Sequence, residues 1–321
     1  MISVVIATFN RRQLLERTLR ALEEQSVPKA VFEVVVADNG SSDGTAELLE
    51  AFRKRGRLDL RVLRVTDPGK SAALNVAVTC ARGDLLVFTD DDVLPEPGWL
   101  AAFADAFATS DADFAAGRIF PLWESPPPAW LSPALYGVLA VPDGGPERRR
   151  LTGLGDATMP IGTNMAVRRG VVERLGGWRT DLGKLRGTLR TGEDHEFYVR
   201  MLRAGCVGIY EPEARVRHFV PAERMRPAYF REWFHGNGRI VALLESDFPT
   251  TDRYLLGVPR YLWRNAAGDL VGGARALASG DRVARLAREV RLRWFLGYLQ
   301  QSWGSRLWPS PGLRAAASSS C

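Results

Sequence analysis

Three consecutive aspartates, Asp90, Asp91 and Asp92, follow the apolar residues 85–88. Adjacent carboxylates repel one another unless a positive charge lies among them. Oxygen ligands at this spacing suit Mg²⁺ or Mn²⁺, with diphosphate oxygens filling further coordination positions. The same residues would also suit a solvated turn, or a cap for a helix that begins near Glu96. From the triplet alone, a divalent-metal site and a turn both stay open.

A second acidic cluster, Glu193 and Asp194, follows Gly192 at the start of a predicted helix. A carboxylate there can act as a general base, with a pKa set by burial and by its neighbours. The alternative is structural, because Thr191 and Asp194 have the spacing of a capping box and acidic residues favour the first turn of a helix. If Asp194 caps the helix, Glu193 remains free for chemistry.

Three further residues have two interpretations each. Asp38 follows an apolar run, and it can accept hydrogen bonds from a ribose or a base, or form an Asx turn. Lys70, after Gly69, can bind phosphate at a helix start, although the spacing differs from that of a P-loop. His218 is one of three histidines and can be a metal ligand or a structural residue.

The elements that would position these residues alternate in the first hundred residues. Short β-branched apolar runs at 2–7, 32–37, 60–65 and 85–89 predict buried strands, and helical periodicity between them predicts helices. This order predicts an α/β fold with a mostly parallel central sheet flanked by helices. Ligands bind beyond the carboxyl ends of the strands in such sheets. The polar residues expected at those ends are Thr8, Asn10, Asp38, Lys70, Asp90, Asp91 and Asp92.

The rest of the chain is less regular. Residues 121–150 are rich in proline and glycine and predict an irregular surface excursion, residues 165–167 predict a short strand, and residues 207–220 predict two. From Pro227 onward the pattern is helical. We therefore expect one domain over residues 1–220, with halves of about 1–110 and 111–220, and a helical extension over 221–321.

Composition excludes several classes of protein. The chain has 321 residues, of which 46% are hydrophobic and 25% charged, as in globular proteins rather than disordered or collagen-like ones. No apolar run is long enough to suggest a membrane-spanning helix. The chain begins without the basic and apolar regions of a secretory signal, and its three cysteines are scattered. These features lead us to expect a cytoplasmic protein.

The extension carries most of the net charge of +6. Residues 221–321 contain 15 arginines, no lysine and eight acidic residues, which gives +7 for this part alone. Such a balance favours an anionic partner. Residues 288–296 can form an amphipathic helix, so we expect either peripheral contact with the cytoplasmic face of a membrane or packing of that face against protein.

Taken together, these residues resemble the inverting nucleotide-sugar glycosyltransferases of family 2, which have the GT-A fold. The matching segments agree in order and spacing over residues 1–220. They are residues 4–10, 35–45, Gly69 and Lys70 with Asn75, 82–84 leading to 88–92, Pro95 with 99–100, 162–164 with Arg168, 176–178, 192–194 and His218.

The resemblance implies a role for each site residue. Thr8, Asp38 and Lys70 would hold the nucleotide, and Asp90 would contact its ribose, with Asn10, Asn75 and Asp91 also on the donor side. Asp92 would ligate the divalent metal, Mn²⁺ or Mg²⁺, with His218 completing its coordination. Asp194 would be the general base, with Glu193 beside it. Residues 1–110 would then form the nucleotide-binding half and 111–220 the acceptor half.

The implied reaction is transfer of one sugar from a nucleoside-diphosphate sugar, with UDP, GDP or dTDP as the carrier, to a hydroxyl of a sugar, lipid-linked or small-molecule acceptor. We expect a role in cell-envelope polysaccharide, glycolipid or glycoconjugate synthesis. The Gln-x-x-Arg-Trp motif of processive synthases has only a partial echo at residues 231–233, which favours single addition. A sugar-nucleotide pyrophosphorylase would need a glycine-rich signature that residues 8–12 do not supply. A non-catalytic nucleotide-sugar module is a further alternative, and nothing in the basic extension matches a nucleic-acid-binding motif.

Overall fold

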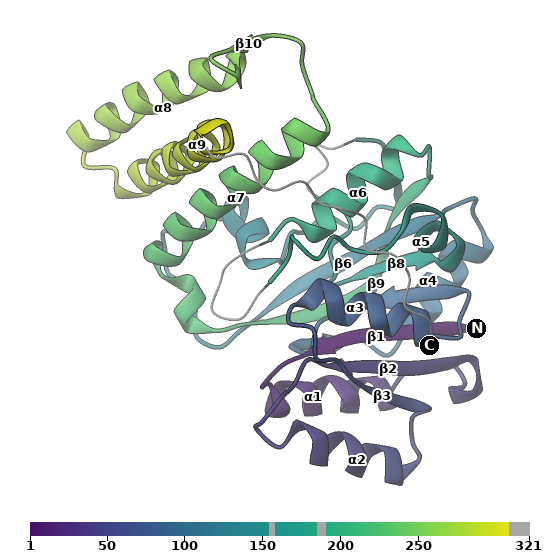
Figure 1. Ribbon diagram of the computed structural model, residues 1–321. Helices are drawn as coiled ribbons and strands as arrows, with labels where there is room; N and C mark the ends of the chain where they lie inside the picture. Colours follow the sequence, from purple (N-terminus) through teal and green to yellow (C-terminus); the bar gives the residue numbers. More distant parts are fainter. Residues whose placement is uncertain (154–157, 185–190, 308–321) are drawn as a thin grey trace. The chain divides into compact units, whose positions relative to one another are not determined.

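A computed structural model describes residues 1–153, 158–184 and 191–307 (Figure 1). The chain forms two compact units, Met1–Phe230 and a second that begins at Arg231. The sequence analysis placed the end of the first domain at residue 220, and residues 308–321 of its predicted extension lie outside the described part. Within the ranges described, no helix is both long and apolar enough to span a membrane.

The first half of unit one is the predicted alternation of strands and helices. Strands lie parallel in the order β3-β2-β1-β4, and the register pairs Thr8 with Asp38 at their carboxyl ends. β1 and β2 are buried on both faces, which explains their continuous runs of valine and isoleucine. The elements are β1 (Ile2–Thr8), α1 (Arg12–Glu23), β2 (Phe32–Asp38), α2 (Thr45–Arg55), β3 (Leu60–Arg64), α3 (Lys70–Cys80) and β4 (Leu85–Phe88).

The second half makes the sheet a mixed one. From β4 the strand order continues β8-β6-β9-β5, with β7 also paired to β9. β8 is antiparallel to both β4 and β6, whereas β6 and β9 are parallel. These elements are β5 (Val93–Pro95), α4 (Trp99–Ala108), β6 (Phe114–Trp123), β7 (Arg149–Leu151), β8 (Met165–Arg168), α5 (Arg169–Leu175), α6 (Glu193–Arg203) and β9 (Gly208–Val220).

β9 is one long strand, where the sequence analysis predicted two short ones. The register against β6 shifts between Gly117 and Arg118, which pair with Glu211 and Arg215 respectively. The three residues between Glu211 and Arg215, including Pro212, therefore form an irregularity within a continuous strand, as proline in a sheet requires. Beyond it, β9 pairs with β5 so that His218 lies opposite Val93, directly after the acidic triplet.

The predicted excursion at 121–150 is mostly loop. β6 extends into it as far as Trp123, and β7 begins near its end. Short 3-10 helices occur here and elsewhere in unit one, at Lys29–Val31, Pro133–Leu139 and Ala222–Met225.

The second unit is helical apart from one hairpin. Its elements are α7 (Pro227–Asp247), which begins in the last residues of unit one, β10 (Tyr254–Leu255), β11 (Val258–Pro259), α8 (Arg260–Ala278) and α9 (Arg282–Leu307). Its core is formed by Ala242, Val258, Leu262, Ala266, Phe295 and Tyr298.

The amphipathic face predicted at residues 288–296 packs inside this unit. Val290 and Phe295 are buried, and Trp294 packs against the core and donates its indole N–H to Asn237 at 2.9 Å. Arg288 and Arg291 both bind the buried Asp269 at 2.8 Å. This face is therefore a packing surface, and a lipid contact in the extension has to be sought elsewhere.

Gly83 lies where β1 and the approach to β4 are too close for a side chain. A Cβ at this position would lie 2.6 Å from the backbone nitrogen of Ser3 and 2.7 Å from the carbonyl carbon of Ile2. We predict that Gly83→Ala lowers the free energy of unfolding by about 1–3 kcal/mol, because the strand backbone must shift. Urea denaturation measures this. Gly170→Ala is the control, since a Cβ at exposed Gly170 meets no described atom within 4 Å, and an equal loss in both variants would contradict the prediction.

Candidate functional site

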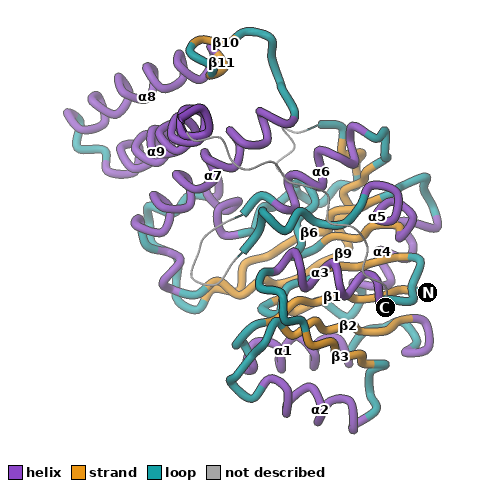
Figure 2. The backbone as a smooth tube through the Cα atoms, viewed as in Figure 1, coloured by secondary structure: helices purple, strands orange, loops and turns teal. Residues whose placement is uncertain are grey.

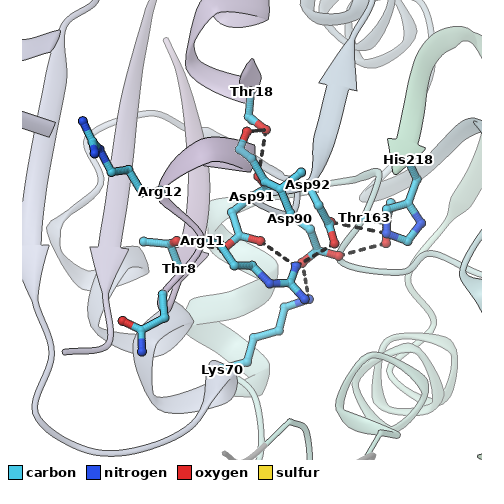
Figure 3. A network of polar contacts seen from close by, with 12 residues as sticks. Thr8, Arg11, Arg12, Thr18, Lys70, Asp90, Asp91, Asp92, Thr163 and His218 are labelled. Atoms are coloured by element: carbon cyan, nitrogen blue, oxygen red, sulfur yellow. Dashed lines mark hydrogen bonds and ion pairs between the residues drawn. The ribbon is translucent and has the colours of Figure 1, made fainter. Parts of the chain in front are cut away.

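The carboxyl ends of the parallel strands meet at one cavity. Thr8, Lys70 and the three aspartates of the triplet line it, as predicted for ligand-binding residues at this edge. Figure 3 shows Arg11, Lys70 and His218 converging on the triplet. The other residues that line the cavity are Ala7, Phe9, Arg11, Asn39, Gly69, Ala73 and Lys184.

Lys70 begins α3 and binds the first aspartate of the triplet. Its Nζ lies 2.5 Å from Asp90 Oδ1, and Thr163 donates its hydroxyl to Asp90 Oδ2 at 3.0 Å. Burial raises the pKa of Asp90, but the charges of Lys70 and Lys184 and the hydrogen bond from Lys70 together lower it to about 2. Lys184, which the sequence analysis missed, also lies near Asp90, and burial lowers its pKa. The cavity thus holds an ionised Asp90 among cations.

Arg11 binds the other two aspartates, and the sequence analysis did not find it. Its Nη1 lies 2.9 Å from Asp91 Oδ1 and 2.6 Å from Asp92 Oδ2. Thr8 donates its hydroxyl to Asp91 Oδ2 at 2.7 Å. Burial, and then repulsion from Asp92, raise the pKa of Asp91 to about 6 despite Arg11. Arg11 is therefore the counter-ion that lets two buried carboxylates sit side by side.

Asp92 and His218 form a pair that suits a divalent cation. Burial opposes ionisation of Asp92, but His218, followed by Arg11 and Arg224, holds its pKa well below the usual range. Asp92 Oδ1 lies 3.3 Å from His218 Nε2, yet among the described residues it has no hydrogen-bond partner, and neither does His218 Nδ1. Two neighbouring ligands of an octahedral Mg²⁺ or Mn²⁺ lie about 3 Å apart, so Asp92 Oδ1 and His218 Nε2, 3.3 Å apart, are close enough to ligate one such ion together.

The protein would supply few of the ligands of such a metal site. Over the part of the chain that is described, no group of three or more His, Cys, Asp or Glu side chains is arranged to hold a metal. Two protein ligands leave most positions for water or phosphate oxygens, which is how Mg²⁺ is commonly bound in nucleotide sites.

Asp194 does not cap α6, contrary to the capping-box alternative. The residue before the helix is Gly192 in a left-handed conformation, with no side-chain cap. Asp194 Oδ2 instead accepts the Gly162 N–H at 2.8 Å, and Oδ1 accepts the Trp178 indole N–H at 3.2 Å. A Cβ placed on Gly162 would lie 3.1 Å from Lys70 Nζ and 3.3 Å from Asp194 Oδ2. Asp194 and Lys70 therefore converge at the same point.

Glu193 is buried next to Asp194. Burial, and then the charge of Asp194, raise its pKa to about 7, although Lys70 acts in the opposite direction. The two neighbours thus differ sharply. Asp194 accepts hydrogen bonds from two N–H donors, whereas Glu193 is a desolvated acid with a pKa near neutrality.

Asn75 reaches this pair indirectly. Its side chain donates to the Trp178 carbonyl and accepts the Trp178 N–H, both at 2.8 Å. Trp178 is also packed between Phe88 and Phe197, with ring centroids 4.7 and 4.8 Å away. Asn75 therefore fixes the tryptophan that holds Asp194, and it is not among the residues that line the cavity.

The predicted donor residues Asp38, the last residue of β2, and Asn10, in the loop after β1, are not among the residues that line the cavity. Asp38 Oδ1 accepts the Ser41 N–H at 2.9 Å, as in the Asx-turn alternative, and the next residue, Asn39, lines the cavity. Asn10 has a left-handed φ of 52°, and its side chain accepts the Ser42 N–H at 2.7 Å. The Asn10 contact ties the loop after β1 to the loop after β2, whereas the Asp38 contact closes a turn within the second of these loops.

A comparison with models of protein families identifies the family of this chain. The model of glycosyl transferase family 2 matches residues 3–176, which is more than half of the chain and includes the acidic triplet. The chain belongs to glycosyl transferase family 2. The resemblance found in the sequence is thereby confirmed.

Relatives and solved structures agree with this assignment. The glycosyltransferase AglE of Haloferax volcanii is 30% identical over 119 residues, which are 37% of this chain but only 39% of AglE. The mannosyltransferase PcManGT of Pyrobaculum calidifontis, solved with GDP-Man and Mn²⁺, has a TM-score of 0.65 at 21% identity, over 94% of this chain and 87% of that one. TarS 1-349 of Staphylococcus aureus, solved with UDP-GlcNAc, has a TM-score of 0.55 at 19% identity, over 94% and 92%. The fold is therefore of the GT-A type.

The raised pKa of Glu193 makes a prediction about stability. Its ordinary value of 4.5 rises to about 7 in the folded protein. Between these values the folded state keeps a proton that the unfolded state releases, so the free energy of unfolding falls as pH rises, by up to about 1.4 kcal/mol per pH unit from this group. We predict that Glu193→Gln flattens this fall between pH 5 and 7, as measured by urea denaturation. The exposed Glu213→Gln is the control, and a Glu193→Gln slope equal to that of the native protein would refute the assignment.

Proposed function

We propose that this family 2 protein transfers a sugar from a nucleoside-diphosphate sugar to an acceptor hydroxyl, with inversion and by single addition. The observation that carries the proposal is the position of Lys70. Its amine binds Asp90 of the triplet and converges with Asp194 beside Gly162. A group suited to bind diphosphate thus lies between the donor side of the cavity and a candidate base.

On the donor side, the residues offer both charge and hydrogen bonds. Lys70 and Lys184 supply positive charge at the cavity wall, where a diphosphate would lie. Thr8, Asp90 and Asp91 would contact the nucleotide, with Asn10, Asp38 and Asn75 shaping the surroundings. Because PcManGT was solved with GDP-Man and TarS with UDP-GlcNAc, we propose a UDP- or GDP-linked donor.

Asp92 and His218 would hold a divalent cation, Mn²⁺ or Mg²⁺. When bound, the ion acts as a Lewis acid on the departing diphosphate. Arg11 lies on Asp91 and Asp92 and would partly neutralise both carboxylates when no cation is bound. The Mn²⁺ in the PcManGT structure supports the choice of ion.

Asp194 would take the proton from the acceptor hydroxyl. The two N–H groups that bind its oxygens fix their direction, and a base held in place is what proton abstraction during a single displacement requires. Attack from the face opposite the leaving diphosphate inverts the anomeric carbon. We further propose that the protein works in the cytoplasm on a sugar, lipid-linked or other hydroxyl acceptor of envelope or glycoconjugate synthesis.

The metal role predicts the behaviour of Asp92→Ala. Transfer should fall by at least about 100-fold, because the diphosphate charge lacks its Lewis acid, and EDTA should have a similar effect on the native protein. Release of nucleoside diphosphate from a panel of donors with Mn²⁺ measures this. Asp111→Ala removes an exposed acid that binds Arg150 and is the control. Full activity in EDTA would refute the metal role.

The base role predicts a different result for Asp194→Asn. Because the amide keeps the size of the carboxylate, donor affinity should persist while transfer falls by about 10²–10⁴-fold. Calorimetry of donor binding and a transfer assay separate the two effects. Glu193→Gln is the matched comparison: if it abolishes transfer and Asp194→Asn does not, Glu193 is the base.

A further inference from the structure

The hairpin of the second unit has a turn that is unusual for its sequence. β10 and β11 are joined by Leu256 and Gly257, both left-handed, with φ of 52° and 75° (Figure 2). Two-residue turns of this kind favour Asn-Gly or Asp-Gly, because a left-handed backbone strains larger side chains. A leucine at the first position is therefore unfavourable for the turn itself, which suggests that its side chain has another use.

The tip exposes apolar surface that a soluble hairpin would avoid. Leu256 is 65% exposed and Leu255 is 50% exposed. Two tryptophans hold the tip, since Trp263 donates its indole N–H to the Leu255 carbonyl and Trp303 to that of Leu256, both at 3.2 Å. The leucines are thus presented by an anchored turn.

Positive charge lies beside these leucines. Arg253, Arg260 and Arg264 line one hollow together with Tyr261. All three arginines are exposed, and among the described residues none lies within ion-pair distance of a carboxylate. Of the nearby acids, Asp252 is exposed, whereas buried Glu245 accepts hydrogen bonds from Thr250 and Tyr254. The surroundings of the tip are therefore net positive.

We propose that this tip, residues 253–264, docks the protein on an anionic lipid surface. Leu255 and Leu256 would enter the boundary between headgroups and acyl chains, Tyr261 would lie at headgroup level, and the three arginines would bind lipid phosphates. Three observations support this docking: an anchored turn, exposed leucines at positions where the turn disfavours them, and arginines that pair with no carboxylate in the part of the chain that is described. The tip is separate from residues 288–296, whose apolar side is buried.

Sedimentation of the full chain with vesicles tests the proposal. Vesicles of phosphatidylcholine with about 30% phosphatidylglycerol are compared with pure phosphatidylcholine, at low and high salt. The first variant combines Leu255→Ser with Leu256→Asn, because asparagine suits the left-handed turn and should preserve folding. The second replaces the three arginines by glutamine. The control combines Leu277→Ser with Val283→Ser, which are 63% and 47% exposed at the α8–α9 turn, about 25 Å along α8 from the hairpin.

We expect the native protein to bind the anionic vesicles at low salt and to release them at high salt. The leucine variant should bind at least tenfold more weakly with an unchanged melting temperature. Each arginine should strengthen binding to the anionic vesicles about fivefold. The control variant should bind like the native protein. Failure of the native protein to bind anionic vesicles, or equal losses in the leucine variant and the control, would overturn the proposal without touching the glycosyltransferase site.

Discussion

The structure of the first unit depends on how three adjacent carboxylates, two of them buried, are neutralised. Asp91 and Asp92 are each about 5% exposed, and such charges are costly to bury unless cations and hydrogen bonds accompany them. Arg11 comes from the turn after β1, Lys70 from the first residue of α3, and His218 from the far end of β9. The sheet order, with β1 beside β4 and β9 beside β5, is what delivers these groups to one place.

Much of the first unit could be predicted, because its local signals agree with its tertiary structure. The β-branched runs of β1, β2 and β4 are buried on both faces, so pattern and burial give the same answer. β9 was harder, because Pro212 and its neighbours interrupt the pattern while the hydrogen bonding continues beyond the irregularity. In the second unit, residues 288–296 have the periodicity of an interfacial helix. Periodicity shows that one face is apolar, but it does not show whether lipid or protein covers that face, and here other helices cover it.

The acidic residues of the site and three of their partners, Thr8, Lys70 and His218, could be named from the sequence, whereas Arg11, Lys184 and Trp178 could not. Asp90 to Asp92 form an obvious cluster, but no spacing rule reports that Arg11, 80 residues earlier, binds two of them. Trp178 looks like a core aromatic, and only the fold shows its indole N–H on Asp194. The capping-box pattern at Thr191 was wrong because Asp194 turns toward Gly162 instead of back onto its own helix.

The pairing of His218 with Val93 also has a consequence for the order in which the protein is built. During synthesis, Arg11, Lys70 and the triplet leave the ribosome well before β9. Contacts between segments so distant in sequence close slowly, since the intervening chain must first be ordered. The half that carries the triplet is therefore fully synthesised before β9 supplies His218. A nascent chain that stops short of β9 has Asp92 but lacks the imidazole of His218.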